Sequence, residues 1–328
     1  MDARPPSTPP TLEYRETGAP DAATLGAMQR LAADLPSAAT HAVDLPYRLA
    51  WQPEPAGAGQ APAVRTALWH AGSQLVGWAV WSPGGRTVEL ATAPQRARTL
   101  IPEILAWGDA HARALPPYRG QDASWSVPAR TDDAGRIAQL EASGFRGASW
   151  ALRRYARRLD APPAAATLPD GYGVRSLRGR DEVPAYVDAH RAAFDSTWMS
   201  VPWRERILET PGYRPELDLV AVAPDGRIAA FAVVWVGPGG GTGAAGQFEP
   251  VGTHPDHRRR GLARALLVEG MRRLRSLGAT QVTVETEEGR LPANGLYASL
   301  LDDSGVRTRY FRYARRARMR SARSPAAR

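Results

Sequence analysis

Three arginines and a glycine stand between a predicted strand and a predicted helix, in the segment HPDHRRRGLARAL (254–266). Gly261 is placed where the helix would begin, and a glycine there lets a ligand approach the backbone closely. The first amides of a helix lack partners within the helix, and the helix dipole makes that end positive. This arrangement is typical of a pyrophosphate site, and the arginines beside it could reach a further phosphate group.

Net charge suggests another use for the same arginines. The chain has 328 residues and a formal net charge of +9 at pH 7, which is compatible with nucleic-acid binding. All 42 of its Lys and Arg residues are arginines, a bias that a GC-rich genome produces without any function. No basic motif interleaved with aromatic residues supports binding to single strands. Nucleic acid is therefore kept only as an alternative partner.

The absence of cysteine limits the chemistry that this chain can perform. The 328 residues contain no cysteine, which excludes disulfides, thiolate metal ligands and an acyl group carried on a thiol. No G-x-S-x-G motif is present, so an acyl-enzyme on serine is not supported either. An acyl transfer by this chain would therefore have to use another nucleophile.

Two further motifs resemble functional sites but lie in the wrong context. His254 and His257 have an H-x-x-H spacing, but Pro255 puts them in a turn and no third ligand is apparent. We therefore predict no metal site. The glycines of GTGAAG (241–246) fit a dinucleotide pattern, yet a strand-like segment follows them where a helix is required. We interpret them as a flexible hairpin loop.

Nothing in the sequence indicates secretion or membrane insertion. Prolines at positions 5, 6, 9 and 10 interrupt the region where a signal peptide would need an apolar run. No segment approaches the roughly 18 apolar residues of a membrane span. A cytoplasmic location without a membrane partner is therefore expected.

The two halves of the chain resemble one another. The pentapeptide RYARR occurs at 154–158 and again at 312–316. Between the halves, a Pro- and Ala-rich segment is typical of a linker, with a boundary near Pro163. The predicted organisation is a disordered tail at 1–11, a first domain at 12–159, a linker at 160–170, a second domain at 171–316 and a disordered basic tail at 317–328.

Hydrophobic periodicity predicts a mixed α/β fold for the second half. Apolar residues of 263–274 recur at helical spacing with arginines on the opposite face, and Gly278 follows as a stop signal. In chain order we predict a helix at 183–194, a hairpin at 217–236, a strand at 247–253, this helix, a strand at 281–287, a helix at 292–300 and a strand at 307–314. Hairpins combined with strand–helix–strand units indicate a mixed sheet flanked by helices.

Two segments of the second half resemble a known family. RRRGLA (258–263) resembles the R/Q-x-x-G-x-G/A loop of the GNAT acetyltransferases, at the same place between a strand and a long helix. PANGLYASL (292–300) is similar to their later helix, which carries a tyrosine that corresponds to Tyr297. Residues 171–316 follow the family's order of elements, and the first half resembles a degenerate copy. The resemblance implies two tandem GNAT-like domains, each with a mixed, partly antiparallel sheet, and acetyl-coenzyme A (acetyl-CoA) as acyl donor.

The resemblance also implies which residues bind this cofactor. In the family, the central strand pairs with the pantetheine arm and the loop amides hold the pyrophosphate. The corresponding residues here are Val251, Gly252, Thr253, Arg258, Arg259, Arg260, Gly261, Leu262, Ala263 and Arg264. Family members often carry an asparagine seven residues before the tyrosine; this chain has Arg290 there, and Asn294 is the predicted substitute.

The central strand carries its own signs of a cofactor entrance. Pro250 cannot donate to a sheet ladder and Gly252 has no side chain, so we predict that the strand bulges or splays where the arm enters. A purely structural kink would have the same sequence.

Two side chains are predicted to move protons. Tyr297, which matches the family's tyrosine, would protonate the leaving thiolate as general acid. Glu249 would act as general base, directly or through water, because alternation places it on the strand face of Val251 and Thr253. An amide of Val251 or Gly252 would stabilise the oxyanion. A core tyrosine and a carboxylate at the mouth of the strand are the structural alternatives.

The first half lacks the features of the phosphate loop. After VELATAP (88–94) the chain continues as QRARTLIPEIL (95–105), without a glycine and with Pro102 in the helical segment. We therefore expect this half not to bind the cofactor. It is predicted either to be structural or to form one wall of the acceptor pocket.

The acceptor is not defined by any motif. The segment 191–207 is expected to lie over the acceptor side, where Trp198, Met199 and Trp203 form an apolar floor or pack into the core. The sequence thus predicts an acetyl-CoA-dependent N-acetyltransferase acting in a ternary complex on an amine of an antibiotic, a small metabolite or a protein N-terminus. A non-catalytic acyl-CoA sensor of the same fold is the main alternative.

Overall fold

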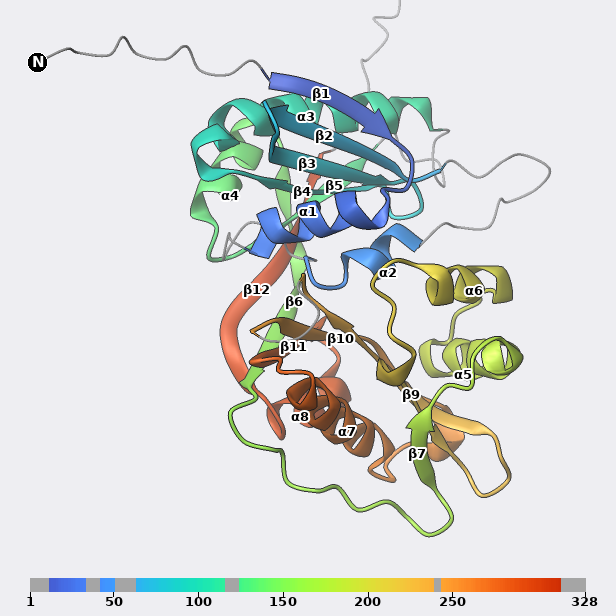
Figure 1. Cartoon of the computed structure of the whole chain (residues 1–328). Coiled ribbons are helices and arrows are strands. Elements are labelled where there is room, and N and C mark those ends of the chain that lie inside the picture. The colour runs from blue at the N-terminus through green and yellow to red at the C-terminus, as the bar shows by residue number, and fades with distance from the viewer. Residues whose placement is uncertain (1–11, 34–41, 51–62, 116–123, 239–242, 314–328) are drawn as a thin grey trace, which may run out of the picture.

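Most of the chain forms strands and helices (Figure 1). The computed structural model describes residues 12–33, 42–50, 63–115, 124–238 and 243–313, and the predicted tails at 1–11 and 317–328 lie outside them. The first half contains β1 (Leu12–Thr17), α1 (Ala22–Ala33), α2 (Leu45–Ala50), β2 (Arg65–Ala71), β3 (Gln74–Ser82), β4 (Thr87–Thr92), α3 (Pro94–Ala114), β5 (Trp125–Arg130), α4 (Ala134–Ala142) and β6 (Arg146–Arg158). The second half contains β7 (Gly173–Ser176), α5 (Val183–Phe194), α6 (Val201–Glu209), β8 (Asp218–Val222), β9 (Ile228–Val236), β10 (Ala245–Thr253), α7 (Leu262–Ser276), β11 (Gln281–Glu287), α8 (Leu291–Ala298) and β12 (Asp302–Tyr313).

All twelve strands of the described residues belong to one sheet, in the order β1-β2-β3-β4-β5-β12-β6-β11-β10-β9-β8-β7. The first half occupies one end of this sheet and the second half the other, but their last strands are exchanged. β12 lies between β5 and β6, and β6 lies between β12 and β11. The segments that echo each other in the sequence therefore pair with one another, antiparallel, at the centre of the sheet.

This strand exchange crosses the predicted domain boundary. β6 belongs to the segment 12–159, yet it pairs with β11 of the second half from Arg158 to Leu152. β12 in turn pairs with β5 of the first half. We propose that the two domains complete each other's sheets, so that a fragment ending at residue 159 would lack the strand next to β5.

Most elements of the second half confirm the predictions. α5 and β11 begin and end at the predicted residues, and the predicted hairpin forms between β8 and β9. The linker 160–170 contains no helix or strand. β12 begins at Asp302, five residues earlier than predicted, because its pairing with β6 extends to Ala156. The segment GTGAAG leads directly into β10, as expected for a loop before a strand, although residues 241–242 lie outside the described part.

Two hydrophobic clusters cover the two faces of the sheet in the second half. Alternation along β9 divides its side chains between them. Ala232 and Val234 face the cluster under α7, whereas Phe231 and Trp235 face the cluster under α5 and α6. Tyr47 of α2, from the first half, joins the second cluster. The two halves are therefore connected by packing as well as by strand pairing.

A buried ion pair joins α6 to β8. Arg204 donates to the carboxylate of Asp218, and the Tyr213 hydroxyl donates to the same carboxylate over 2.7 Å. The side chains of Arg204 and Asp218 are 1% and 0% exposed. The guanidinium also lies 3.8 Å from the centre of the Tyr186 ring. This network fixes α6 on the sheet.

Asp218→Asn should lower the free energy of unfolding by about 3–5 kcal/mol, because it leaves the Arg204 guanidinium buried without a counter-charge. Chemical denaturation followed by tryptophan fluorescence measures this loss. Asp160→Asn is the matched control, since Asp160 pairs with Arg158 where both side chains are more than half exposed. Its denaturation midpoint should match the wild type, and a wild-type midpoint for Asp218→Asn as well would contradict the role of the buried pair.

Candidate functional site

β10 departs from regular pairing in the middle of its length. It pairs with β11, in parallel, from Ala245 to Phe248, and its register against β9 shifts between Phe248 and Val251. The Glu249–Pro250 peptide bond is cis. Beyond Phe248 the edge of β10 that faces β11 has no strand partner among the described residues. The bulge and splay predicted at Pro250 are therefore confirmed.

The same bulge interrupts the alternation from which the face of Glu249 was predicted. Phe248 pairs with Val234 and Val251 pairs with Ala232, so three steps along β10 match two steps along β9. Val234 and Ala232 face the same side, and Phe248 and Val251 therefore share a face as well. Alternation alone thus does not define the face of Glu249, although Glu249 and Val251 both line the cavity described below.

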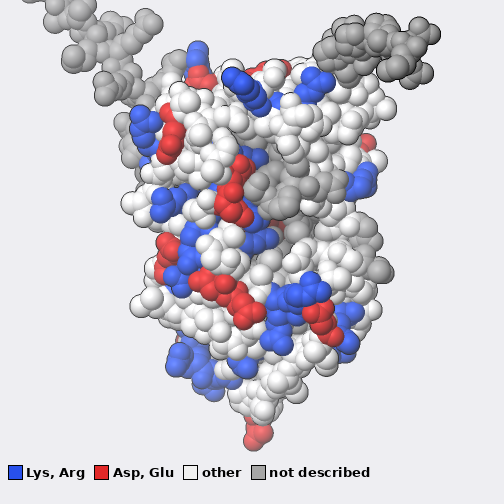
Figure 2. Space-filling view, turned by 90° about the vertical axis from the view of Figure 1, so that its left-hand side faces the viewer, with Lys and Arg blue, Asp and Glu red and all other residues white. Residues whose placement is uncertain are grey.

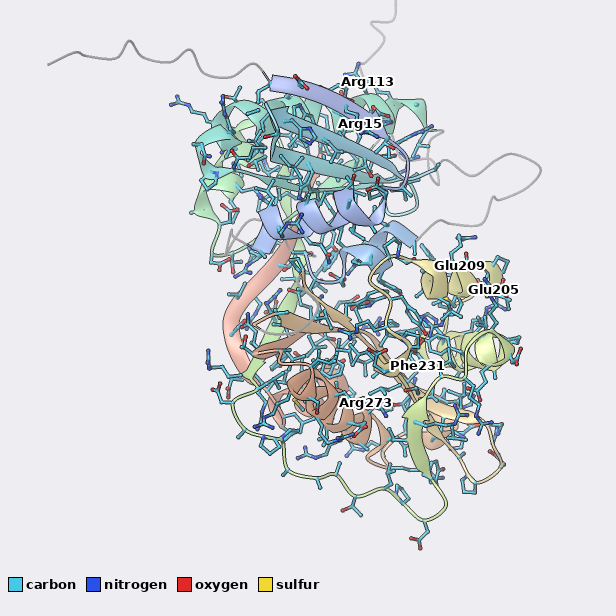
Figure 3. All side chains as sticks on the ribbon, viewed as in Figure 1. Arg15, Arg113, Glu205, Glu209, Phe231 and Arg273 are labelled. Carbon is cyan, nitrogen blue, oxygen red and sulfur yellow. The ribbon has the colours of Figure 1, made fainter. Side chains whose placement is uncertain are left out.

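Packing accounts for Gly252. A Cβ atom at this position would lie 2.3 Å from Cζ of Phe231, whose buried ring comes from the neighbouring strand (Figure 3). No side chain fits there without moving that ring. Packing against Phe231 is thus enough to explain why residue 252 is a glycine, and no ligand is needed for that explanation.

The loop between β10 and α7 presents backbone donors to solvent. Gly261 has a φ of 78° and Arg259 a φ of 63°, both in the left-handed region. The first amide of α7 with a helical partner is that of Ala265, and the amides from Arg259 to Arg264 donate no backbone bond within the described residues. Gly261 is exposed, and the carbonyl of Thr167 is 3.8 Å from its Cβ position. These amides and the helix dipole suit a diphosphate.

The arginines of this loop have different contacts. Arg258 donates to two backbone carbonyls, at 3.1 Å in α5 and 3.4 Å in β10, and so ties the loop to its neighbours. Arg264 donates to the Ser299 hydroxyl over 2.9 Å. Arg260 lies 6.0 Å from the centre of the Tyr172 ring. Arg258, Arg259 and Arg260 are all exposed, so their charges are accessible to an anionic ligand.

The other predicted cofactor residues contribute mainly through their backbone. The side chain of Leu262 is buried in the cluster under α7, and that of Ala263 is half-buried. Val251 packs against the same cluster, and Thr253 ends β10 with a half-buried side chain. Val251 also lines the cavity between β10 and β11.

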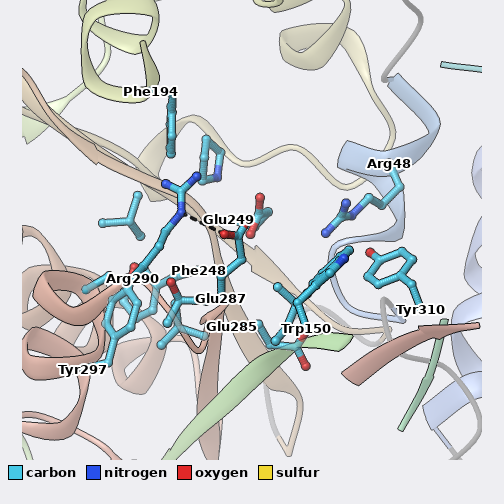
Figure 4. A pocket seen from close by; sticks show the side chains of 16 residues that line it. Arg48, Trp150, Phe194, Phe248, Glu249, Glu285, Glu287, Arg290, Tyr297 and Tyr310 are labelled. Atoms are coloured by element: carbon cyan, nitrogen blue, oxygen red, sulfur yellow. Dashed lines mark ion pairs between the residues drawn. The ribbon is translucent and has the colours of Figure 1, made fainter. Parts of the chain in front are cut away.

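A cavity of about 300 Å³ opens where β10 and β11 separate (Figure 4). It brings together the two predicted catalytic residues, Glu249 and Tyr297. Five charged side chains line it: Glu249, Glu285, Glu287, Arg48 and Arg290. Arg48 of α2 and Trp150 of β6 close it from the first half, which supports the hypothesis that this half forms one wall of the acceptor pocket.

Tyr297 is held in the form that a general acid requires. Its side chain is 5% exposed, and its ring packs against Tyr155 with 5.9 Å between centroids. Burial and, after it, the nearby Glu249 carboxylate raise the pKa of Tyr297 above its ordinary value. The hydroxyl therefore carries its proton throughout the neutral range.

Glu249 lies between elements of both halves. Its backbone carbonyl accepts a hydrogen bond from the Trp235 indole over 2.7 Å, which fixes the bulge. Burial and then the Glu249 carboxylate raise the pKa of both Tyr297 and Tyr47. The negative charge of this carboxylate therefore acts on Tyr297 of α8 and on Tyr47 of α2.

Asn294 is engaged in the fold itself. Its Nδ2 donates to the backbone carbonyls of Glu287, Glu288 and Arg290 over 2.9–3.2 Å, and its Oδ1 accepts from the Tyr155 hydroxyl over 2.9 Å. The side chain is 8% exposed. Asn294 therefore holds the connection between β11 and α8, and both of its amide hydrogens are used there.

The predicted apolar floor is only partly formed. Met199 and Trp203 are buried, at 0% and 5% exposure, so they pack into the core and do not form an exposed floor. Trp198 is 57% exposed and does not line the cavity. The segment reaches the cavity through Phe194 at the end of α5.

Two further observations concern metal binding and membrane insertion. His257 Nδ1 shares a hydrogen bond of 2.9 Å with the Tyr172 hydroxyl. Within the described part of the chain, no group of three or more His, Asp or Glu side chains could hold a metal ion. None of the described helices is long and apolar enough to cross a membrane.

Known proteins match this chain in sequence. Residues 183–301 match the acetyltransferase (GNAT) family. A mycothiol acetyltransferase of Arthrobacter sp. (strain FB24) is 34% identical over 158 residues, which cover 46% of this chain and 48% of the relative. The match thus spans about half the length of that relative. Another mycothiol acetyltransferase, from Cellulomonas flavigena, is 30% identical over 247 residues, 69% of each chain.

Solved structures share the fold over nearly the whole chain. A tandem GNAT protein from the clavulanic acid biosynthesis pathway aligns with a TM-score of 0.65 and 19% identity, covering 93% of this chain and 98% of its own. A GCN5-related N-acetyltransferase from Sphaerobacter thermophilus aligns with a TM-score of 0.60 and 22% identity, covering 92% and 95%. Together with the loop between β10 and α7, the match to the Cellulomonas flavigena relative shows that this chain belongs to the GNAT acetyltransferase family.

Proposed function

We propose that this chain transfers the acetyl group of acetyl-CoA to an amine by direct attack in a ternary complex. The observation that carries the proposal is that pairing between β10 and β11 stops at Phe248, where the cavity with Glu249 and Tyr297 lies, while the amides at Gly261 without backbone partners follow the far end of the same strand. A diphosphate and a reacting thioester would therefore lie at the two ends of one path.

The loop and the strand would divide the binding of acetyl-CoA between them. The amides of Arg259 to Arg264 would hold the diphosphate, with the exposed side chains of Arg258, Arg259 and Arg260 available to its charges. The open edge of β10 at Val251, Gly252 and Thr253 would pair with the amide groups of the pantetheine arm, as a strand would.

The chemistry would require three proton transfers. Glu249 would take a proton from the bound ammonium group, and the freed nitrogen would attack the thioester carbonyl. The oxyanion would be stabilised by the amide of Val251 or Gly252 on β10. When the carbon–sulfur bond breaks, Tyr297 would donate its phenolic proton to the thiolate and take back the second proton that the nitrogen loses as it becomes an amide, while Glu249 releases its proton to solvent.

The cavity suggests the charge of the acceptor. Of the three carboxylates that line it, Glu285 pairs with Arg154 and Glu287 pairs with Arg290, and we infer that the Glu249 carboxylate attracts a cationic amine. The relatives are named mycothiol acetyltransferase, and an amine related to mycothiol is therefore the first acceptor to test. Antibiotic amines, small metabolic amines and peptide N-termini follow.

Two other functions make different predictions. A non-catalytic acyl-CoA sensor would bind acetyl-CoA without turnover. A nucleic-acid binder would lose affinity steeply with salt, but the face shown in Figure 2 carries acidic and basic side chains side by side. Arg307, for example, pairs with both Asp303 and Glu288. The geometry favours acetyl transfer over both.

An acceptor screen that follows release of free thiol from acetyl-CoA tests the proposal. The chain has no cysteine, so the protein itself contributes no background to a thiol reagent. We expect amine-dependent release with at least one cationic amine. Saturable binding of coenzyme A without release for any amine class would favour the sensor instead.

A further inference from the structure

Arg48 reaches the cavity from the first half, and we propose that it is a positioning residue that holds the Glu249 carboxylate toward the acceptor amine. This inference rests on the proposed function and adds to it a residue from outside the second half. It would make the half that lacks a phosphate loop a working part of the catalytic unit.

The helix that carries Arg48 is clamped between the two halves. Leu45 and Leu49 belong to a cluster with α1 and β3 of the first half. Tyr47 belongs to the cluster under α5 and α6 of the second half, with its ring centroid 6.2 Å from that of Trp235. A helix anchored in both cores can hold a side chain over the gap between them with little freedom.

One edge of the Arg48 guanidinium is fixed at the start of α2. Its Nε lies 3.0 Å from Oδ2 of Asp44, one turn earlier, and the Asp44 side chain is fully buried. The rest of the guanidinium lines the cavity and points toward Glu249 (Figure 4). A guanidinium is planar with donors on several edges, so one edge can bind Asp44 while another faces the cavity.

The other two carboxylates of the lining have arginine partners of their own. Glu285 is paired with Arg154 of β6 at 3.0 Å. Glu287 is paired with Arg290 at 3.6 Å, on the α8 side of the cavity. Arg48 is the guanidinium that approaches Glu249 from the opposite side.

The carboxylates near Arg48 also change its pKa. Burial lowers its pKa, but the carboxylates of Asp44 and Glu249 outweigh burial and raise the pKa well above its ordinary value. The titratable and charged groups around Glu249 are Tyr47 and Arg48 of α2, Tyr186 of α5, Glu285 and Glu287 of β11, Arg290 and Tyr297 at α8, and Tyr310 of β12.

Arg48→Gln in the full chain tests the inference with the best amine found in the screen. A displaced carboxylate should lower kcat/KM by about 100-fold, and the acidic limb of its pH profile should move up by about one pH unit. The dissociation constant of coenzyme A, measured by calorimetry, should not change. Arg48→Lys keeps the charge and should return the acidic limb to its wild-type position.

Arg113→Gln is the matched control, because Arg113 pairs with Asp109 one turn earlier on α3, far from the cavity lining. It should leave the pH profile unchanged. If Arg48→Gln does not fold, the double variant Asp44→Asn, Arg48→Gln removes the carboxylate left buried and gives the same readout.

An active wild type combined with an unchanged rate and pH profile in the Arg48 variants would overturn this inference alone. A wild type that binds coenzyme A but acetylates no amine would overturn the proposed function, and the inference with it.

Discussion

Replacing Gly261 by glutamate is expected to abolish coenzyme A binding and amine-dependent thiol release together. The residue begins α7 with a φ of 78°, and its new carboxylate would stand among the amides that hold the diphosphate. Each charge-assisted hydrogen bond lost costs about 1.5–3 kcal/mol, so the affinity should fall on the order of 100-fold or more. Titration calorimetry with coenzyme A measures the loss.

Gly72→Glu separates this effect from backbone strain. Gly72 lies in the turn between β2 and β3 with a φ of 61°, and no atom comes within 4 Å of its Cβ position. The same substitution there imposes a similar conformational cost far from α7. It should leave binding and turnover intact, whereas tight binding of coenzyme A by Gly261→Glu would remove the loop from the proposed site.

Tyr297→Phe is expected to reduce kcat by about 10²–10⁴-fold with the affinity for coenzyme A preserved. Only the hydroxyl is removed, so the ring still packs against Tyr155, but the leaving thiolate has no proton donor at that position. Steady-state kinetics combined with calorimetry separate the two quantities. A sensor protein would have no turnover to lose.

Tyr155→Phe is the matched control for that experiment. Its hydroxyl donates to Asn294 and not into the proposed reaction path. The variant should lose some stability, about 1 kcal/mol for one hydrogen bond, and keep its turnover. Equal losses of kcat in the two tyrosine variants would mean that packing, and not proton donation, explains Tyr297.

Local patterns were sufficient to predict most elements of the second half, though not β7 or α6, and they did not predict which strands pair. The helix over 183–194 and the strand over 281–287 have clear periodicity and stop signals, and both form as predicted. Strand exchange depends on contacts between residues about 130 positions apart, such as Arg154 with Glu285. The RYARR repeat marked β6 and β12 as equivalent strands, but equivalence does not reveal that they pair.

Part of the candidate site, too, could be predicted from local sequence, and part could not. Pro250 predicted the irregularity of β10, because a proline cannot donate to a ladder. The face of Glu249 could not be derived from alternation, since a bulge adds a residue that alternation does not count. Arg48 was missed because packing between the halves brings it to the cavity of Glu249, and its local sequence LPYRLA has no motif that would reveal this.

The position of β6 and β12 bears on how this protein responds to cleavage and to loss of either half. Proteolysis within residues 160–170 should leave both products associated, because each retains a strand that the other needs to complete its hydrogen bonds. Melting should likewise proceed as one cooperative transition rather than two. A half without its own phosphate loop can thus be retained during evolution because it supplies β6 to the sheet of its partner.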